Sequence, residues 1–448
     1  MFKRKIEAVL IDWKERKDHK PIVIKGCRQC GKTSSVIAFA KKNYTHVIYM
    51  DFHEHREYKP FFAGALDVDT IKLNITLGMP NAVFVPGKTC IIFDEIQDCP
   101  NARASLKFFK LDGRFDVICT GSLLGVNGYN LSGDPNDDYH ASIPVGFEEI
   151  VNMYPMDFEE WLWANGVLPE HFEYLRACFE EEKPVSEAIH QRLRELLLNY
   201  VIVGGMPEAV SVFIETNDMR RTQLVQRNII DTYKGDMIKY ASPKDKPRIR
   251  ECFESIPQQL AKENKKFTYS QIRQNARANQ YIGSLQWIED AGIIHRCYNL
   301  SITELPLDGN AIRDCFKVYM ADIGLLVSML EEGTAWSIKQ GNMLSYKGAI
   351  FESLIADILG KMGRKLYYFQ KSSGLELDFV MRYKGECYPL ECKAKTGNAK
   401  SMKTVLNHPE HYHVYNAIKV GDYNIGRNGP LLTIPFYLAF MLTQYTPN

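Results

Sequence analysis

A loop between a predicted strand and a predicted helix carries the residues of a phosphate-binding site. Gly26 to Thr33 has the spacing G-x-x-x-x-G-K-[ST], after the apolar run 21–24 and before the helical pattern 34–40. Glycines let successive backbone N–H groups point at one phosphate, and the helix start adds its positive end. We expect Lys32 to reach the β- and γ-phosphates and Thr33 to hold Mg²⁺. The sequence therefore predicts a site for ATP and Mg²⁺.

The predicted nucleotide contacts cover the whole loop. They are Gly26, Cys27, Arg28, Gln29, Cys30, Gly31, Lys32, Thr33 and Ser34. Cys27 and Cys30 have the C-x-x-C spacing that is found in redox and metal sites, but both occupy variable positions of the loop, which favours coincidence. A disulfide that closes the loop against nucleotide is the alternative. Equal affinity for ATP under oxidising and reducing conditions would exclude it.

Two acids end a second buried strand. The run 89–95 is apolar until Asp94 and Glu95. A strand that is buried on both faces presents its functional residues at its C-terminal edge. We expect Asp94 to hold Mg²⁺ and Glu95 to polarise the attacking water as a catalytic base. A helix cap is the alternative role for paired acids after a strand.

A polar residue follows the next predicted strand, 115–120. Ser122 is the expected catalytic residue that senses the γ-phosphate, and Thr120 is the second candidate. Capping of the next helix is the alternative for both hydroxyl groups.

The C-terminal part of the chain carries a second group of charged residues on predicted strands. Glu391 and Lys393 alternate along one strand and share a face, and a tight turn brings Asp378 towards them. Metal-assisted cleavage of a phosphodiester uses carboxylates to hold Mg²⁺ and a lysine to position water. We expect Asp378, Glu391 and Lys393 to be catalytic, with Glu352, Asp378 and Glu391 as metal ligands. A solvated strand face is the alternative.

The region from 239 to 300 is basic and has the element order of a winged helix. Its eleven Lys and Arg residues against six Asp and Glu residues leave a net charge of +5. Helices are predicted at 267–272 and 279–291, followed by a strand at 292–298. DNA is one expected partner and a docked protein is the other, because +5 neutralises only a few phosphates. The DNA-facing residues would be Gln280, Tyr281, Ser284 and Gln286 towards bases, and Arg273 and Arg277 towards phosphates.

The whole chain has the composition of a multidomain soluble protein. It has 448 residues, 45% apolar and 24% charged, with a net charge of +1. Its cysteines are scattered, which favours free thiols in the cytoplasm. The apolar run 431–442 is too short to cross a bilayer, so we expect a cytoplasmic protein without a membrane partner. Oligomerisation is left open.

Together these motifs resemble the prokaryotic AAA+-type ATPases with a C-terminal domain of unknown function 4143. The resemblance is carried by 26–33, 93–97, 120–122, 154–162 and 204–208. It implies an α/β protein: a P-loop ATPase domain at 1–165, a helical linker at 166–238, a winged helix at 239–335, and a domain like the PD-(D/E)xK nucleases at 336–448. Asp378, Glu391 and Lys393 match the D…E-x-K signature, and Glu352 matches the acid of its first helix.

One feature departs from that family. Its members commonly carry an arginine before the Tyr-Pro-type segment, where a trans-acting finger would lie, but residues 143–149 contain none. Arg103 and Arg114 are the fallback candidates.

Three functions follow from these observations. The first is an ATP-hydrolysing protein whose nucleotide state controls the distal domains. The second is an ATP-regulated, Mg²⁺-dependent nuclease that acts on DNA or RNA. The third is a switch or scaffold that binds nucleotide without hydrolysing it.

Overall fold

The chain folds into two compact units. A computed structural model describes residues 1–122, 146–240, 245–262, 264–342, 346–393 and 400–443. The first unit consists of Met1–Pro155, Gly235–Pro243 and Asp290–Gly292, and the second of Met156–Lys234, Lys244–Glu289 and Ile293–Asn448. The finer division into four domains stays a prediction.

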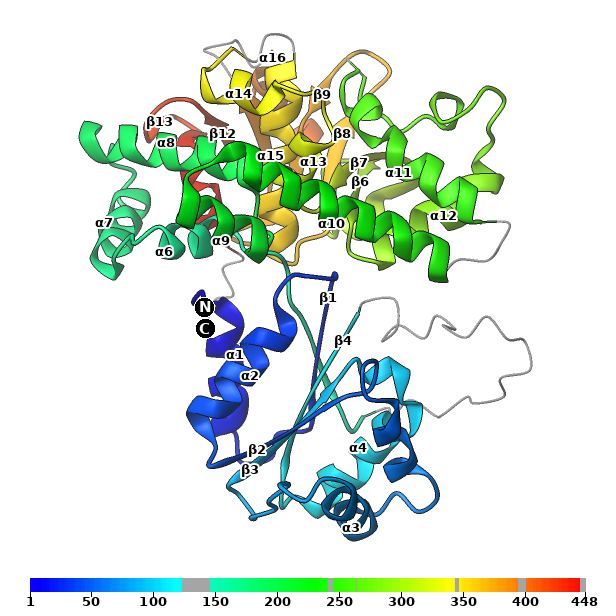
Figure 1. The fold of residues 1–448 in the computed structure, drawn as a ribbon. Coiled ribbons are helices and arrows are strands. Elements are labelled where there is room, and N and C mark those ends of the chain that lie inside the picture. The colour runs from blue at the N-terminus through cyan, green and yellow to red at the C-terminus, as the bar shows by residue number, and fades with distance from the viewer. Residues whose placement is uncertain (123–145, 241–244, 263, 343–345, 394–399, 444–448) are drawn as a thin grey trace. The chain divides into compact units, whose positions relative to one another are not determined.

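The first unit contains a five-stranded parallel sheet in the order β2-β3-β4-β1-β5 (Figure 1). Its described elements are α1 (Lys5–Glu15), β1 (Ile22–Gly26), α2 (Lys32–Asn43), β2 (His46–Asp51), the 3₁₀ helix η1 (Arg56–Phe62), α3 (Val68–Gly78), β3 (Thr89–Asp94), η2 (Ile96–Asp98), α4 (Pro100–Asp112), β4 (Asp116–Ser122) and β5 (Glu149–Asn152). The α/β prediction and its four strands are confirmed. The edge strand β5 escaped the sequence analysis because it is only four residues long and exposes Ile150.

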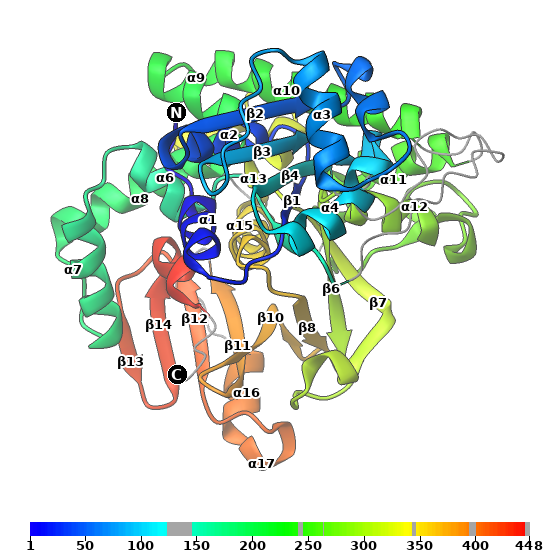
Figure 2. The same cartoon turned by 90° about the horizontal axis from the view of Figure 1, so that it is seen from below.

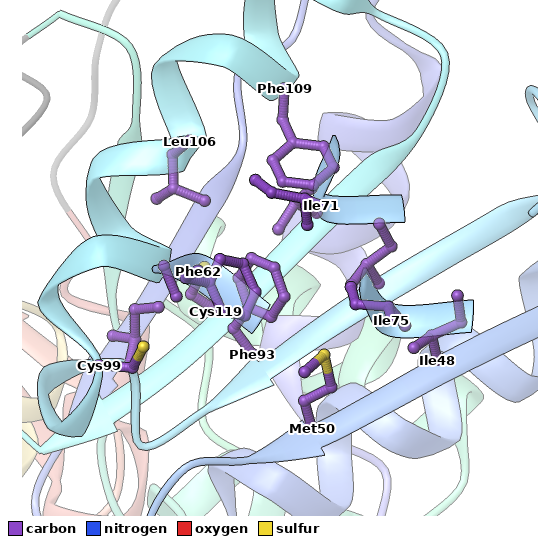
Figure 3. Close-up of a cluster of buried hydrophobic side chains, with 14 of the residues drawn as sticks. Ile48, Met50, Phe62, Ile71, Ile75, Phe93, Cys99, Leu106, Phe109 and Cys119 are labelled. Carbon is purple, nitrogen blue, oxygen red and sulfur yellow. The ribbon is translucent and has the colours of Figure 1, made fainter. Parts of the chain in front are cut away.

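Two apolar cores cover the two faces of this sheet. Leu10 and Trp13 of α1 and Phe39 of α2 pack on one face. Helices α3 and α4 lie on the other, where Ile71 and Phe109 meet the strands (Figure 3). Strand β3 is buried along its whole length, as its apolar sequence predicted. Because the strands are parallel, the carboxyl ends of β1, β3 and β4 meet at one edge.

The second unit contains mixed α/β layers. The elements that lie in it wholly or for most of their length, among the residues described, are α6 (Phe158–Ala164), α7 (Pro169–Glu180), α8 (Glu187–Val203), α9 (Pro207–Thr216), α10 (Met219–Tyr240), α11 (Lys246–Leu260), η3 (Tyr269–Gln271), α12 (Ala278–Asp290), β6 (Ile294–Leu300), η4 (Leu307–Asn310), β7 (Ala311–Met320), α13 (Ile323–Ser328), α14 (Thr334–Lys339), α15 (Lys347–Lys361), β8 (Leu366–Gln370), β9 (Glu376–Leu377), β10 (Phe379–Tyr383), β11 (Glu386–Lys393), α16 (Lys400–Asn407), α17 (Pro409–Tyr412), β12 (Ala417–Gly421), β13 (Gly426–Asn428), β14 (Leu431–Pro435) and η6 (Phe436–Met441). Within the described part of the chain, no helix is long and apolar enough to cross a bilayer.

Two sheets organise the C-terminal part of this unit. One has the order β10-β11-β12-β14-β13, and the other has the order β7-β6-β8-β9. Strands β11, β12 and β14 run side by side (Figure 2). Helix α15 packs on β11, β7 and β8, so it contacts strands of both sheets. The predicted helix at 347–359 and the α/β class of this part are confirmed.

The basic segment follows the predicted order only in part. Helix α11, helix α12 and the antiparallel pair β6 and β7 are present, but the predicted helix at 267–272 is the 3₁₀ turn η3. Tyr281 and Ser284 are buried on the inner face of α12, so their assignment to DNA bases was wrong. The types of these side chains do not by themselves reveal which face of α12 packs inwards. The winged helix itself stays a prediction.

A buried ion cluster lies against the glycine pair at 204–205. The Lys361 ammonium lies 2.8 Å from Asp357 and 3.1 Å from Asp322, and both acids are buried. Asp322 also accepts a hydrogen bond of 2.7 Å from the Gly205 N–H. A Cβ on Gly205 would lie 1.9 Å from the Met156 carbonyl oxygen, so a side chain has no room there.

Candidate functional site

The backbone of the phosphate loop depends on two glycines. Strand β1 ends at Gly26, where a Cβ would lie 2.2 Å from the Met153 carbonyl oxygen and would push the loop away from the segment after β5. Gly31 has φ of 94°, in the left-handed region that costs other residues free energy, and it caps α2. The loop geometry therefore needs both glycines that the motif contains.

Lys32 is buried, and among the described residues its hydrogen-bond partners are backbone carbonyl groups. Its Nζ donates to the Gly26 oxygen at 3.1 Å and to the Cys27 oxygen at 2.9 Å. Carbonyl oxygens carry only partial charge, so they compensate the ammonium only in part. Together with the start of α2, Lys32 could hold an anion.

Asp94 collects three hydroxyl groups at the end of β3. Thr33 Oγ1 donates to its Oδ1 at 3.1 Å, Thr120 Oγ1 donates to the same oxygen, and Tyr49 Oη donates to Oδ2 at 2.8 Å. Burial and the hydrogen bond to Asp94 raise the pKa of Tyr49. The predicted metal ligands Thr33 and Asp94 are thus brought together, and their oxygen donors fit Mg²⁺.

Glu95 has a strained backbone next to Asp94. Its φ and ψ are 50° and 49°, in the left-handed region that is uncommon for residues with a side chain and often marks functional positions. Its carboxylate accepts a hydrogen bond from Gln97 Nε2. Glu95 is therefore held by an amide.

Ser122 lies beside the loop. The parallel register pairs Ser122 with Gly26 across β4 and β1. Thr120, the second sensor candidate, is the one that donates to Asp94. Both positions adjoin the predicted nucleotide site, and which of them senses phosphate stays a prediction.

Tyr49 and Arg4 are two residues of the site that sequence reasoning missed. Arg4 donates from Nη1 to the Cys30 oxygen at 2.8 Å and from Nη2 to the Tyr154 oxygen at 2.7 Å, so it ties the loop to the segment after β5. Its position 26 residues before Cys30 carries no motif. The polar end of Tyr49 in an otherwise apolar strand was the one available signal for that residue.

The two cysteines of the loop are buried free thiols. The hydrogen bond with Cys27 lowers the pKa of Cys30 to about 6, aided by the charges of Lys32 and Arg4 and opposed by burial. The disulfide, the alternative to a coincidental spacing, stays a hypothesis.

Both fallback finger arginines bind acids of the first unit. Arg103 donates to both oxygens of Glu148, at 2.6 and 3.1 Å. Arg114 pairs with Asp112 and Asp69. Their guanidinium groups therefore already serve intramolecular ion pairs.

A family model described as an AAA domain matches residues 18–162, which include the sheet and the loop described above. The first unit is an AAA-type P-loop ATPase domain. Two further models, both described as domains of unknown function, follow it: DUF8612 at residues 194–335 and DUF4143 at residues 347–437. The chain thus combines an AAA domain with a C-terminal DUF4143 region, and the predicted resemblance is confirmed. Nuclease activity stays a prediction.

Several solved structures are similar to this chain at low identity. A Walker-type ATPase of Pyrococcus abyssi is 16% identical over 73% of this chain and 96% of its own, with a TM-score of 0.45. DnaA of Aquifex aeolicus with bound AMPPCP is 14% identical over 63% and 86% of the two chains, with a TM-score of 0.26. A STAND protein of Pyrococcus horikoshii is 12% identical over 80% and 45%, with a TM-score of 0.25. No curated protein matches this sequence.

The DUF4143 region brings the predicted residues Asp378, Glu391 and Lys393 together. The antiparallel register of β10 and β11 pairs Phe379 with Leu390, and its continuation places Asp378 opposite Glu391. Lys393 Nζ lies 2.6 Å from Glu391 Oε1, and the Cys392 N–H donates to Asp378 at 2.8 Å.

The carboxyl groups of Asp378 and Glu391 have too few partners to compensate their burial. Glu391 Oε2 is buried and has no hydrogen-bond partner among the described residues. Burial and the charges of Glu352 and Glu391 raise the pKa of Asp378 to about 7, and burial raises the pKa of Glu391.

Glu352 is not joined to this pair as a third metal ligand. Its oxygens accept from Lys317 at 3.1 Å, from Lys265 and from the Tyr319 hydroxyl. Burial opposes its ionisation, but the charges of Lys317 and Lys265 outweigh burial and lower its pKa to about 2. Within the described ranges, no three Asp, Glu, His or Cys side chains form a metal-binding group. The expected metal-binding set of Glu352, Asp378 and Glu391 is therefore not assembled, because the oxygens of Glu352 are already paired with Lys317 and Lys265.

Proposed function

We propose that the AAA domain binds ATP with Mg²⁺ and hydrolyses it, and that its nucleotide state controls the second unit. The observation that carries the proposal is the Lys32 ammonium, which is buried in the phosphate loop and whose hydrogen-bond partners, in the described part of the chain, are two backbone carbonyl oxygens. A cation in this position gains a charge partner when a phosphate replaces the carbonyl groups. An ordinary glycine turn would not bury an ammonium in this way.

The residues of the chain divide the work of hydrolysis. Lys32 exchanges its carbonyl partners for phosphate oxygens, and the loop N–H groups surround the same phosphate. Thr33 and Asp94 would hold Mg²⁺, which neutralises charge on the phosphate oxygens when bound. Glu95 leaves Gln97 and accepts a proton from the attacking water.

Two substitutions separate binding from turnover. Lys32→Ala should abolish ATP binding, whereas Glu95→Gln should keep binding and lower the turnover by about 10²- to 10⁴-fold. Binding is measured with a fluorescent ATP analogue, and turnover by phosphate release with Mg²⁺. Gln97→Ala is the matched control, since it removes only the partner of Glu95. Full turnover in Lys32→Ala would contradict the proposal, and wild-type protein that retains ATP unhydrolysed would favour the switch.

We also propose that the DUF4143 region cleaves phosphodiesters with a divalent cation. The buried, unpartnered Glu391 Oε2 opposite Asp378 supports this function, because a cation would satisfy both. Asp378 and Glu391 would hold the ion, which activates water when bound. Lys393 adjoins Glu391 and is placed to neutralise charge on the phosphodiester.

A nicking assay tests the cleavage proposal. Wild-type protein with Mn²⁺ should relax supercoiled plasmid or cut RNA, and Asp378→Asn and Lys393→Met should not. Added ATP should change the wild-type rate, and Lys32→Ala should remove that change. No cleavage of either nucleic acid by wild-type protein in any nucleotide state would exclude the proposal.

The DNA partner would meet a smaller surface than the sequence predicted. Arg273, Arg277 and Gln280 are exposed at and before the start of α12. We propose that these residues make the contact. Arg273→Ala with Arg277→Ala should weaken the shift of a mixed-sequence duplex at low salt. An unchanged shift would leave protein docking as the role of this segment.

A further inference from the structure

A second buried lysine lies among the acids of the DUF4143 region. Lys317 is on β7 with its side chain only 1% exposed. A buried ammonium is costly unless acids compensate it. Its Nζ lies 3.1 Å from Glu352 Oε1 and 2.8 Å from Glu376 Oε1, and 4.8 Å from the centre of the Tyr368 ring. Lys317 therefore bridges two carboxylates that come from different elements, α15 and β9.

The remaining oxygen of Glu352 also has a cationic partner. Lys265, which precedes η3, pairs with Glu352 Oε2, while the Tyr319 hydroxyl shares Oε1 with Lys317. Burial and the charges of Glu352 and Glu376 act on Lys317 in opposite directions, and the acids prevail and raise its pKa. Every oxygen of Glu352 is therefore engaged by the chain itself.

The acids of this region outnumber its lysines. Glu352 and Glu376 pair with Lys317 and Lys265, and Glu391 pairs with Lys393. The charge of Lys317 also acts on Asp378. Among the described residues, four carboxylates against three ammonium groups leave one negative charge when all are ionised. The buried Glu391 Oε2 has no hydrogen-bond partner within the described chain, so Glu391 and Asp378 opposite it are the place for a further cation.

We infer that Lys317 is a built-in cation that occupies the place of a second metal ion, so that the centre takes one divalent cation, at Asp378 and Glu391. An ammonium bridges two carboxylates as a divalent ion does, but it has no free coordination position for water. Lys317 is a positioning residue: it fixes Glu352 and Glu376 and removes their charge. This inference rests on the proposed cleavage function and specifies its metal requirement.

The number of bound Mn²⁺ ions tests the inference. Free Mn²⁺ is followed by electron paramagnetic resonance in the full chain, without nucleotide and with Thr33→Val to remove the contribution of the phosphate loop. The parent should bind one ion, and Asp378→Asn should bind none. Lys317→Met leaves Glu376 without a lysine and Glu352 with one, and this variant should bind two ions. Lys317→Arg keeps the charge and should still bind one.

Each result has a separate meaning. Two ions in the parent, one of them lost in Glu352→Gln, would overturn the role of Lys317 but leave metal-dependent cleavage intact. No ion in the parent would overturn both this inference and the cleavage proposal. One ion in a Lys317→Met protein with an unchanged circular dichroism spectrum would also overturn the inference. If Lys317→Met does not fold, the count in the parent and in Glu352→Gln decides.

Discussion

Lys32 and Lys317 are both buried lysines in predicted phosphate chemistry, but their partners differ. Lys32, in the AAA domain, donates to two backbone carbonyl oxygens. Lys317, in the DUF4143 region, donates to two carboxylates. We expect the first ammonium to exchange its carbonyl groups for an incoming phosphate, whereas the second is already paired with acids. The partners of a buried charge thus separate a binding group from a structural one.

Energetics follow the same contrast. A hydrogen bond from a charged donor contributes about 1.5–3 kcal/mol, and its loss leaves no charge behind when the partner is a neutral carbonyl group. Removal of one member of a buried ion pair costs about 3–5 kcal/mol, because it leaves an uncompensated charge. The same substitution should therefore act mainly on stability at Lys317 and mainly on ATP binding at Lys32.

The largest expected effect comes from replacing each lysine by methionine. Lys317→Met should lower the free energy of unfolding by about 3–5 kcal/mol and leave ATP affinity unchanged. Lys32→Met should abolish ATP binding and cost less stability than Lys317→Met, because its carbonyl partners carry no net charge. Denaturant unfolding and a nucleotide titration measure the two quantities. Equal stability losses in both variants would break the comparison.

A buried base, His295, extends the comparison. His295 on β6 has a buried Nε2 without a hydrogen-bond partner among the described residues, and burial together with the Lys361 charge lowers its pKa to about 4. The unfolded chain, with a His pKa near 6.5, then takes up the proton first as the pH falls. Above pH 6.5 His295 is neutral in both states, and its proton uptake costs no stability. Towards pH 4 the unfolded chain binds the proton and the folded chain does not, so the free energy of unfolding falls by about 1–3 kcal/mol.

The measurement for His295 is a pH series of denaturant unfolding. In His295→Leu the stability should depend less steeply on pH between 4 and 6.5, whatever its absolute value. An unchanged slope would show that His295 is not the group that titrates.

The phosphate loop can be tested through its first glycine. Gly26→Ala puts a Cβ against the Met153 oxygen and should cost about 1–3 kcal/mol and most of the ATP affinity. Gly348→Ala in α15 is the control, because its Cβ would meet nothing within 4 Å. That variant should be neutral or slightly stabilising. Similar losses in both would show that the loop is not the constrained element.

The smallest expected effect belongs to Tyr49. Tyr49→Phe removes one hydrogen bond to Asp94 and should cost about 0.5–1.5 kcal/mol of stability. ATP affinity should change by a few-fold at most, because Lys32 and the loop are untouched. A complete loss of ATP binding would assign Tyr49 a direct role at the nucleotide. ATP binding would then depend on several connected side chains and not mainly on Lys32.

The sequence by itself determined the parts of the protein that depend on short spacings. Gly26 to Thr33 lies within one strand–loop–helix unit, and Asp94 ends one apolar strand, so local pattern sufficed for both. The resemblance to ATPases with a C-terminal DUF4143 region was likewise carried by short segments, such as 93–97 and 204–208.

Tertiary structure alone decided which side chains complete or close the sites. Arg4 and Tyr49 reach the nucleotide site from other elements, and Lys317 and Lys265 reach Glu352 from positions 35 and 87 residues away. The burial of Tyr281 was decided in the same way, by which face of α12 packs inwards. Sequence spacing fixes neighbours along one element, whereas packing brings together side chains from different elements, and the partners of a buried charge are of the second kind.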